Sequence, residues 1–189
     1  MRAGALYRIA AVAGVACAVI LIFNSFRRGG AIPENGLTHT VAPFGALAGV
    51  FALSGLYLYQ RVATGTLGTV AYALNAAGLI GAFAIEYIRH FVFPNLDRST
   101  VDALVAGGST RAAFLATAFT LIVGALLFGV ASWRAGTYPR AAVLLYALGL
   151  VPGSLAGAVP EIVYLGGLCT AAVGVAWMSL SLYRAPVVA

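Results

Sequence analysis

Six long apolar segments, separated by short clusters of charged residues, constrain the fold of this 189-residue chain more than any other feature. A helix that crosses a bilayer needs about 20 mainly apolar residues, and each segment approaches that length. The predicted spanning helices cover residues 5–26, 41–60, 67–90, 111–133, 141–158 and 160–183. The fifth is interrupted by Pro152-Gly153, which membrane helices tolerate. We therefore expect an all-α fold, in which residues 1–189 form one integral membrane bundle of six transmembrane helices.

The low content of charged residues supports this class of protein. Only 8% of the residues are charged, whereas soluble domains carry about 25%. The net charge of +6 comes from arginine alone, since the chain contains no lysine. These arginines are scattered through the turns and do not form the dense stripe that neutralises nucleic-acid phosphates. They indicate topology and contacts with lipid headgroups, so we expect membrane lipids, and not nucleic acid, as partners.

The distribution of charges predicts the orientation of the bundle. Alternate crossings place every acidic residue and both histidines at one end: Glu34, His39, Glu86, His90, Asp97, Asp102 and Glu161. The opposite end receives no acid, and its arginines outnumber those of the acidic end by six to five. By the positive-inside rule, this basic end and both termini are cytoplasmic. The expected location is the cytoplasmic (inner) membrane of a bacterium, with the first apolar run retained as a helix because no small-residue cleavage site ends it.

Two further patterns concern the loops and the packing of helices. Residues 99–105 have a capping residue, an early acid and an apolar face, which predicts a short outer helix between the third and fourth spanning helices. Gly149, Gly153 and Gly157 share one face of the fifth helix, and small residues at this spacing let helices approach closely in lipid. We therefore expect a tightly packed bundle. The same glycine face would permit a homodimer through the fifth helix, or packing against a larger membrane complex.

The third predicted helix carries the most informative polar pattern. Residues at steps of three and four place one stripe along it: Tyr72, Asn75, Leu79, Ala82, Glu86 and His90. In one interpretation, this stripe is the polar wall of an outward-open cavity, with Glu86 as a buried general acid. In the other, Glu86, Arg89 and His90 form a snorkelling cluster that ends the helix at the headgroups.

Three more residues complete the candidate site. Glu161 opens the sixth helix and is either an ordinary helix-start acid or a partner carboxylate across the mouth from Glu86. Asp97 either caps or solvates the outer loop, as Asp102 does, or acts as a second proton acceptor. His39 precedes the second helix and can meet His90 at the same end. A metal site of two histidines and a glutamate lacks compact ligand spacing here, and we predict no metal.

Several short motifs bear on the family. They are residues 128–140 (FGVASWRAGTYPR) at the fourth-to-fifth helix turn, residues 55–60 (GLYLYQ) at the end of the second helix, His39 before that helix, and Glu86 followed by Phe93-Pro94. In these motifs the chain resembles a widespread family of small bacterial six-helix integral membrane proteins whose function is not established. The resemblance spans most of the chain and implies the six-helix fold, but it assigns no role to any residue.

The favoured function is an outward-facing cavity for a hydrophobic or amphipathic molecule, which includes a membrane enzyme that modifies a lipid or an isoprenoid. In the enzyme, Glu86 would be the general acid and Glu161 or Asp97 the acceptor. Small membrane terpene cyclases are similar in size and in relying on intramembrane carboxylates. The ligand-binding candidates, several of which would shape an apolar pocket, are Tyr72, Asn75, Phe83, Tyr87, His90 and His39.

Two other functions remain open. A small proton-coupled transporter would need polar groups in the cytoplasmic half, and few are present there beyond Asn75, Thr117 and Thr120. An accessory subunit would pack against a larger membrane complex through the glycine-rich faces. The sequence contains no glycine-rich phosphate loop, nucleophile elbow or haem-attachment motif, and we expect no cofactor.

Overall fold

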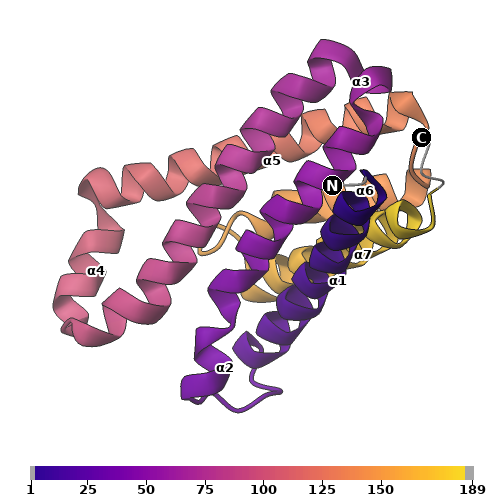
Figure 1. Ribbon diagram of the computed structural model, residues 1–189. Coiled ribbons are helices and arrows are strands. Elements are labelled where there is room, and N and C mark those ends of the chain that lie inside the picture. The colour runs from indigo at the N-terminus through magenta and orange to yellow at the C-terminus, as the bar shows by residue number, and fades with distance from the viewer. Residues whose placement is uncertain (1–2, 186–189) are drawn as a thin grey trace.

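The computed structural model describes residues 3–185, and every regular element in that range is helical. The helices are α1 (Ala3–Arg28), α2 (Gly36–Thr40), α3 (Ala42–Tyr87), α4 (Arg98–Ala106), α5 (Gly108–Ala135), α6 (Arg140–Gly153) and α7 (Glu161–Arg184) (Figure 1). A π-helical turn, Ile88–Val92, and a 3₁₀ turn, Phe93–Asn95, follow α3. The predicted all-α class is confirmed over this range.

The 46-residue α3 is a helical hairpin and not one straight rod. Gly65 has φ 54° and ψ −145°, a conformation that only glycine adopts easily, and the helix reverses direction there. The Ser54 hydroxyl lies 3.1 Å from that of Tyr72, 18 positions later, although a straight helix would separate them by about 27 Å. In Figure 1, α3 rises from α2, turns, and runs back toward α4. The two arms, 42–64 and 66–87, correspond to the predicted helices 41–60 and 67–90.

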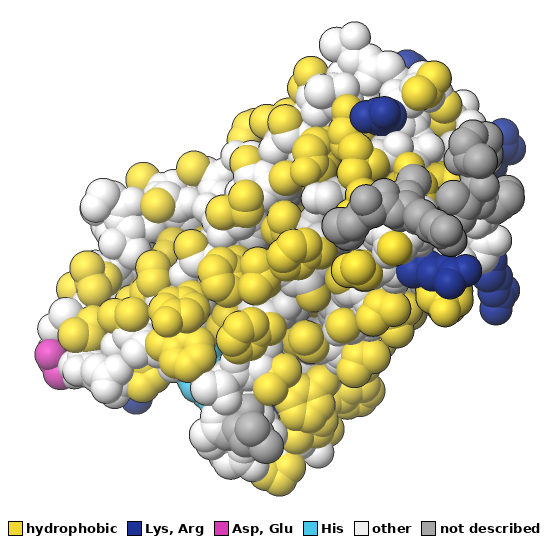
Figure 2. All heavy atoms as spheres, viewed as in Figure 1, with side chains coloured by type: hydrophobic (Ala, Val, Ile, Leu, Met, Phe, Trp, Pro, Cys, Tyr) yellow, Lys and Arg dark blue, Asp and Glu magenta, His cyan; other side chains and the backbone are white. Residues whose placement is uncertain are grey.

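The helices pack as a bundle in which α1 lies against α3 and α7, while α5 packs on α3 and α6 on α7. The Arg8 guanidinium lies 6.0 Å from the Tyr183 ring centre, and that of Arg28 lies 4.8 Å from the Tyr164 ring centre. These contacts make α1 and α7 antiparallel. Figure 2 shows hydrophobic side chains over most of one face, several arginines gathered at one end and an acidic group at the other.

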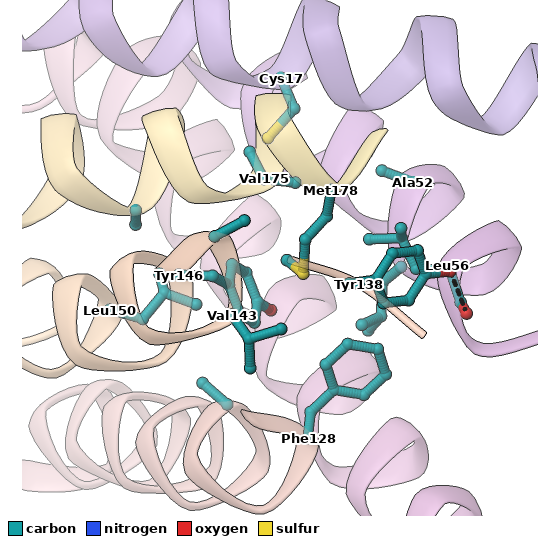
Figure 3. Close-up of a cluster of buried hydrophobic side chains, with 14 of the residues drawn as sticks. Cys17, Ala52, Leu56, Phe128, Tyr138, Val143, Tyr146, Leu150, Val175 and Met178 are labelled. Carbon is teal, nitrogen blue, oxygen red and sulfur yellow. Dashed lines mark hydrogen bonds between the residues drawn. The ribbon is translucent and has the colours of Figure 1, made fainter. Parts of the chain in front are cut away.

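The bundle interior is mainly apolar and draws side chains from α1, α3, α5, α6 and α7. Phe128, Val143, Tyr146 and Met178 converge there (Figure 3), and Phe128 is fully buried. At the basic end, the Tyr138 hydroxyl donates to the Leu56 carbonyl oxygen at 2.9 Å. Burial, assisted by the neighbouring tyrosines, raises the pKa of Tyr138 above its usual value, so the phenol stays a hydrogen-bond donor.

Glycines allow two helix pairs to touch backbone to backbone. A Cβ on Gly78 would lie 2.5 Å from the Leu121 Cα, which places α3 and α5 in direct contact. A Cβ on Gly149 would lie 2.5 Å from the Ala171 nitrogen, which does the same for α6 and α7. The glycine face predicted for a homodimer is therefore covered by α7 within one chain. Gly157 lies outside the helix and has φ 78°.

The outward surface suits a lipid environment. Within residues 3–185, four helical segments are long and apolar enough to cross a membrane: Gly4–Arg28, Thr38–Asn95, Gly108–Ala135 and Glu161–Arg184. Large apolar side chains are exposed along them, among them Ile9, Val12, Phe51, Val62, Phe119 and Ile162. The length and composition of these helices are those of a helical integral membrane protein.

The predicted fifth helix, 141–158, is too long. The observed α6 ends at Gly153, because Pro152 interrupts the hydrogen-bond pattern and residues 154–160 form turns. Its 14 residues extend about 21 Å, which is less than the roughly 30 Å of a hydrocarbon core.

The short helix predicted between the third and fourth apolar segments is present as α4. Asp97 was predicted to cap or solvate this segment, and it caps α4, because its carboxylate accepts from the Thr100 amide at 2.9 Å.

Candidate functional site

A buried arginine, Arg27, organises the acidic end of the bundle. It lies in the last turn of α1 and is only 5% exposed. Its Nε and Nη2 atoms donate to the Asn24 Oδ1 at 3.2 and 2.8 Å. Its Nη1 atom forms an ion pair with Glu34, whose side chain is 66% exposed. The guanidinium is thus held from its own helix and from the loop that follows.

Both histidines of the chain meet at this guanidinium. The Nη1 atom of Arg27 lies 3.0 Å from the His39 Nδ1, and Nη2 lies 3.2 Å from the His90 Nε2. The two imidazole rings are 4.2 Å apart between centres. Because a guanidinium only donates, each facing ring nitrogen acts as an acceptor. The His90 Nδ1 then donates to the Glu86 carbonyl oxygen at 2.7 Å, which fixes the neutral tautomer of His90.

Local sequence explains how these side chains are presented. The Asn35 side chain accepts from the Thr38 amide while the Thr38 hydroxyl accepts from the Asn35 amide, a capping box that starts α2 and sets His39. The π-helical turn Ile88–Val92 inserts an extra residue per turn at the end of α3. His90 lies in this turn and is 9% exposed.

A recess of about 150 Å³ adjoins this cluster. It lies between the second arm of α3, α5 and the connection from α6 to α7. Its polar lining residues are Glu86, Arg89, Thr117, Ser154 and Tyr164. Apolar side chains that include Ile85, Phe114, Leu115 and Leu121 form much of the rest.

Glu86 is the carboxylate of this recess, and its side chain is 18% exposed. Its Oε1 atom lies 3.9 Å from the Arg89 Nη1, and its Oε2 atom lies 3.5 Å from the His90 Nδ1. The Oε2 atom is buried and accepts no hydrogen bond from any residue that the structure describes. The Arg89 guanidinium also lies 5.5 Å from the Phe114 ring centre, so both charges face apolar surroundings.

The predicted polar stripe does not line a single cavity. Tyr72 stacks on Tyr57 at 4.5 Å in the bend region of α3, far from the recess. The Asn75 amide donates to the Tyr146 hydroxyl at 2.7 Å in the middle of the bundle. Tyr72 and the Asn75 Nδ2 thus contact other parts of the bundle, whereas the Asn75 Oδ1 is buried and accepts no hydrogen bond from a described residue. Of the stripe, Ala82 and Glu86 line the recess.

The predicted aromatic pocket is also placed differently. Phe83 and Tyr87 pack on each other with ring centres 5.9 Å apart, and Tyr87 is 47% exposed. Neither lines the recess, since they lie on another face of α3; Phe114 and Tyr164 provide the aromatic walls instead.

The two other predicted carboxylates stay outside the recess. Glu161 is exposed in the first turn of α7 and does not line the recess. Asp97 is exposed and engaged as the cap of α4. Neither carboxylate therefore faces Glu86 across the recess. Each of the two acids lies at the start of a helix whose first turn is at the surface.

Arg27 and Asn24 are functional candidates that the sequence interpretation missed. Arg27 was expected to mark topology and contact headgroups, yet it is buried. The available signal was Asn24, one helical turn before Arg27 at the end of an apolar run. A polar amide there indicates a partner for a charge that turns inward. No group of three metal-ligating side chains forms within residues 3–185.

Comparison with protein-family models, with curated proteins and with solved structures finds no match for this chain. The functional argument therefore depends on the site itself.

The Asp97 carboxylate provides a testable property outside the membrane segments. It accepts from the Ser99 hydroxyl at 2.6 Å and from the Thr100 hydroxyl at 2.8 Å. These hydrogen bonds favour the charged form and lower the pKa of Asp97 from 3.8 to about 2. Since the folded-state pKa lies below the usual value, the cap stabilises α4 fully above that usual value and is lost as the pH falls through about 2.

We expect the combined change Ser99→Ala and Thr100→Val to raise the pKa of Asp97 toward 3.8, because both hydroxyl donors disappear. The measurement is a carboxyl ¹³C NMR titration of the full chain in micelles. Ser109→Ala removes a hydroxyl outside the cap and should leave the midpoint near 2. An unchanged midpoint in the double variant would show that these hydroxyls do not cause the shift.

Proposed function

We propose that the protein is a multi-pass protein of the cytoplasmic membrane of a bacterium, with six crossings and both termini in the cytoplasm. The two arms of α3 would count as separate crossings, and α6 with its following turns would form the fifth. The basic end, with Arg8, Arg61 and Arg134, would face the cytoplasm, in line with the positive-inside rule. The acidic end and its recess would then face outward.

We further propose that the recess binds the polar head of an amphipathic molecule, specifically an uncharged hydroxylated head. The observation that carries this proposal is the buried Glu86 Oε2, which accepts no hydrogen bond from a described residue and, among the buried atoms of this kind, is the one whose residue lines the recess. Buried acceptors are normally satisfied, so this atom favours a ligand that donates a hydrogen bond. Arg89, 3.9 Å from the other carboxylate oxygen, supplies a donor beside it. A hydroxyl both donates and accepts, and it brings no charge that either side chain would repel.

The size of the recess favours binding of part of a molecule over a reaction that must enclose a whole isoprenoid. Pockets that enclose a small molecule measure about 300–1,000 Å³, and this recess has about 150 Å³. It therefore suits a head and the first part of a chain, with the remainder of the molecule in the bilayer. Acid catalysis is less well supported, since Glu161 and Asp97 do not line the recess.

A photolabelling experiment tests this function. The full chain in lipid nanodiscs is exposed to three probes of equal chain length, each with a diazirine and an alkyne: a long-chain alcohol, a fatty acid and a long-chain amine. The alcohol should label peptides that line the recess more strongly than the other two. Glu86→Leu should reduce this labelling about tenfold or more, because a hydrogen bond to a charged group contributes roughly 1.5–3 kcal/mol.

Glu161→Leu is the matched control, since it removes an exposed carboxylate at the same end without touching the recess. Its labelling should equal that of the unmodified chain. Stronger labelling by the acid or the amine, or undiminished alcohol labelling in Glu86→Leu, would reject a hydroxylated head.

A further inference from the structure

A second hollow lies on the lipid-facing surface at the other end of the molecule. It is a groove of about 290 Å³ between α5 and α6. Its lining is apolar apart from one arginine: Leu126, Gly129, Val130, Trp133, Arg134, Val143, Leu144, Ala147 and Leu148. The groove shares no residue with the recess at the acidic end.

The groove arises from the sizes of the residues on the two helices. A Cβ on Gly129 would lie 2.7 Å from the Ala147 Cβ, so α5 and α6 approach closely along this small-residue line. Larger side chains, Leu126 on α5 and Leu148 on α6, stand on either side of the line. Both are exposed, at 38% and 58%. The result is an open groove whose apolar lining suits a hydrocarbon chain.

Two arginines lie where this groove reaches the basic end. Arg134 lines the groove from the last turn of α5. The Arg140 guanidinium, from the first turn of α6, lies 5.1 Å from the ring centre of Trp133, which also lines the groove. Neither arginine forms an ion pair with another residue in the range 3–185. The sequence contains no acidic residue between Asp102 and Glu161, so neither of the two helices that form the groove carries a carboxylate side chain.

We infer that this groove binds an anionic phospholipid. One acyl chain lies along the line of Gly129 and Ala147, and the phosphate contacts Arg134 and Arg140. Arginines between helices at the cytoplasmic surface, with an interfacial tryptophan, bind anionic headgroups through charge-assisted hydrogen bonds. A second copy of this chain fits less well, because a symmetric contact would bring four arginines together. The inference is independent of the ligand proposed for the acidic end.

Native mass spectrometry of the full chain tests the inference. The protein, released from micelles that contain equal amounts of phosphatidylglycerol and phosphatidylcholine with the same acyl chains, should retain the anionic lipid at least fivefold more. Arg134→Gln combined with Arg140→Gln should abolish this preference. Arg61→Gln combined with Arg184→Gln removes the same charge from exposed positions at the same end outside the groove, and should leave the preference within twofold.

A third variant separates a seated lipid from simple surface charge. Leu144→Trp fills the groove from its lipid-facing side, since Leu144 is 44% exposed, and it leaves both arginines in place. It should reduce retention of the anionic lipid at least fivefold. Full retention in Leu144→Trp, equal retention of the two lipids by the unmodified chain, or displacement of the lipid by millimolar inorganic phosphate would each overturn the inference. A shift to dimers in the unmodified chain that Leu144→Trp reverses would assign the groove to a second copy instead.

Discussion

Arg27→Met is expected to destabilise the bundle by about 3 kcal/mol, because it removes the donor that the Asn24, His39 and His90 acceptors share. A single hydrogen bond within a membrane bundle contributes only about 0.6 kcal/mol on average. Here several bonds are lost at once, and the buried acceptors on Asn24 and His90 remain without a partner. The loss should be measured as a shift in unfolding by sodium dodecyl sulfate in mixed micelles, followed by tryptophan fluorescence.

Arg28→Met is the matched control for this prediction. Arg28 is adjacent and carries the same charge, but it is half-buried and contacts the ring and the hydroxyl of Tyr164, the latter at 3.3 Å. Its loss should cost no more than about 1 kcal/mol, the size of a cation–π contact near the surface. Equal shifts for the two arginines would mean that Arg27 is no more than another interfacial charge.

A double-variant cycle assigns the effect to the histidine contact. If Arg27 acts through the His90 Nε2 at 3.2 Å, then His90→Leu should cost less in the Arg27→Met background than alone. Strict additivity would contradict a shared network. Ser109→Ala lies outside the network and should add fully in both backgrounds.

The apolar lengths and the placement of charges predicted most of the fold. Five of the six predicted helical segments match the observed ones to within a few residues at each end, because apolar length and charged turns are local properties of the sequence. The meeting of His39 with His90 was also predictable, since alternate crossings bring the two to one end. The early end of α6 was not predictable from the sequence, because proline interrupts some membrane helices and only bends others. Which of these occurs here depends on how α6 packs against α7.

The composition of the site was harder to predict than its location. The contacts of Arg27 with His39 and His90 span 12 and 63 positions, so no local pattern encodes them. Helical spacing placed Asn75 and Glu86 on one stripe, yet the same face meets different partners along its length. Asn75 bonds to Tyr146 inside the bundle, whereas Glu86 reaches the recess. Periodicity gives the face of a helix, and only the neighbouring helices decide what each residue on it does.

Gly174→Leu should prevent α6 and α7 from packing and leave little folded protein in micelles. A Cβ at this position already lies 2.7 Å from the Tyr146 Cα and meets its backbone nitrogen, so neither helix can yield by moving a side chain. Even Gly174→Ala should cost about 2 kcal/mol, within the range for overpacked cores. Because Tyr146 holds Asn75 through its hydroxyl, the separation should also disturb the contact with α3.

Gly166 on the same helix provides the control, since a Cβ there would meet nothing within 4 Å. Gly166→Ala should leave unfolding by sodium dodecyl sulfate unchanged, or stabilise α7 slightly through higher helix propensity. Gly166→Leu should be tolerated too, because its side chain would extend toward lipid. If Gly166→Leu and Gly174→Leu reduced the folded yield equally, the cost would come from leucine on α7 in general. If only Gly174→Leu does so, close backbone contact between α6 and α7 is what holds this part of the bundle together.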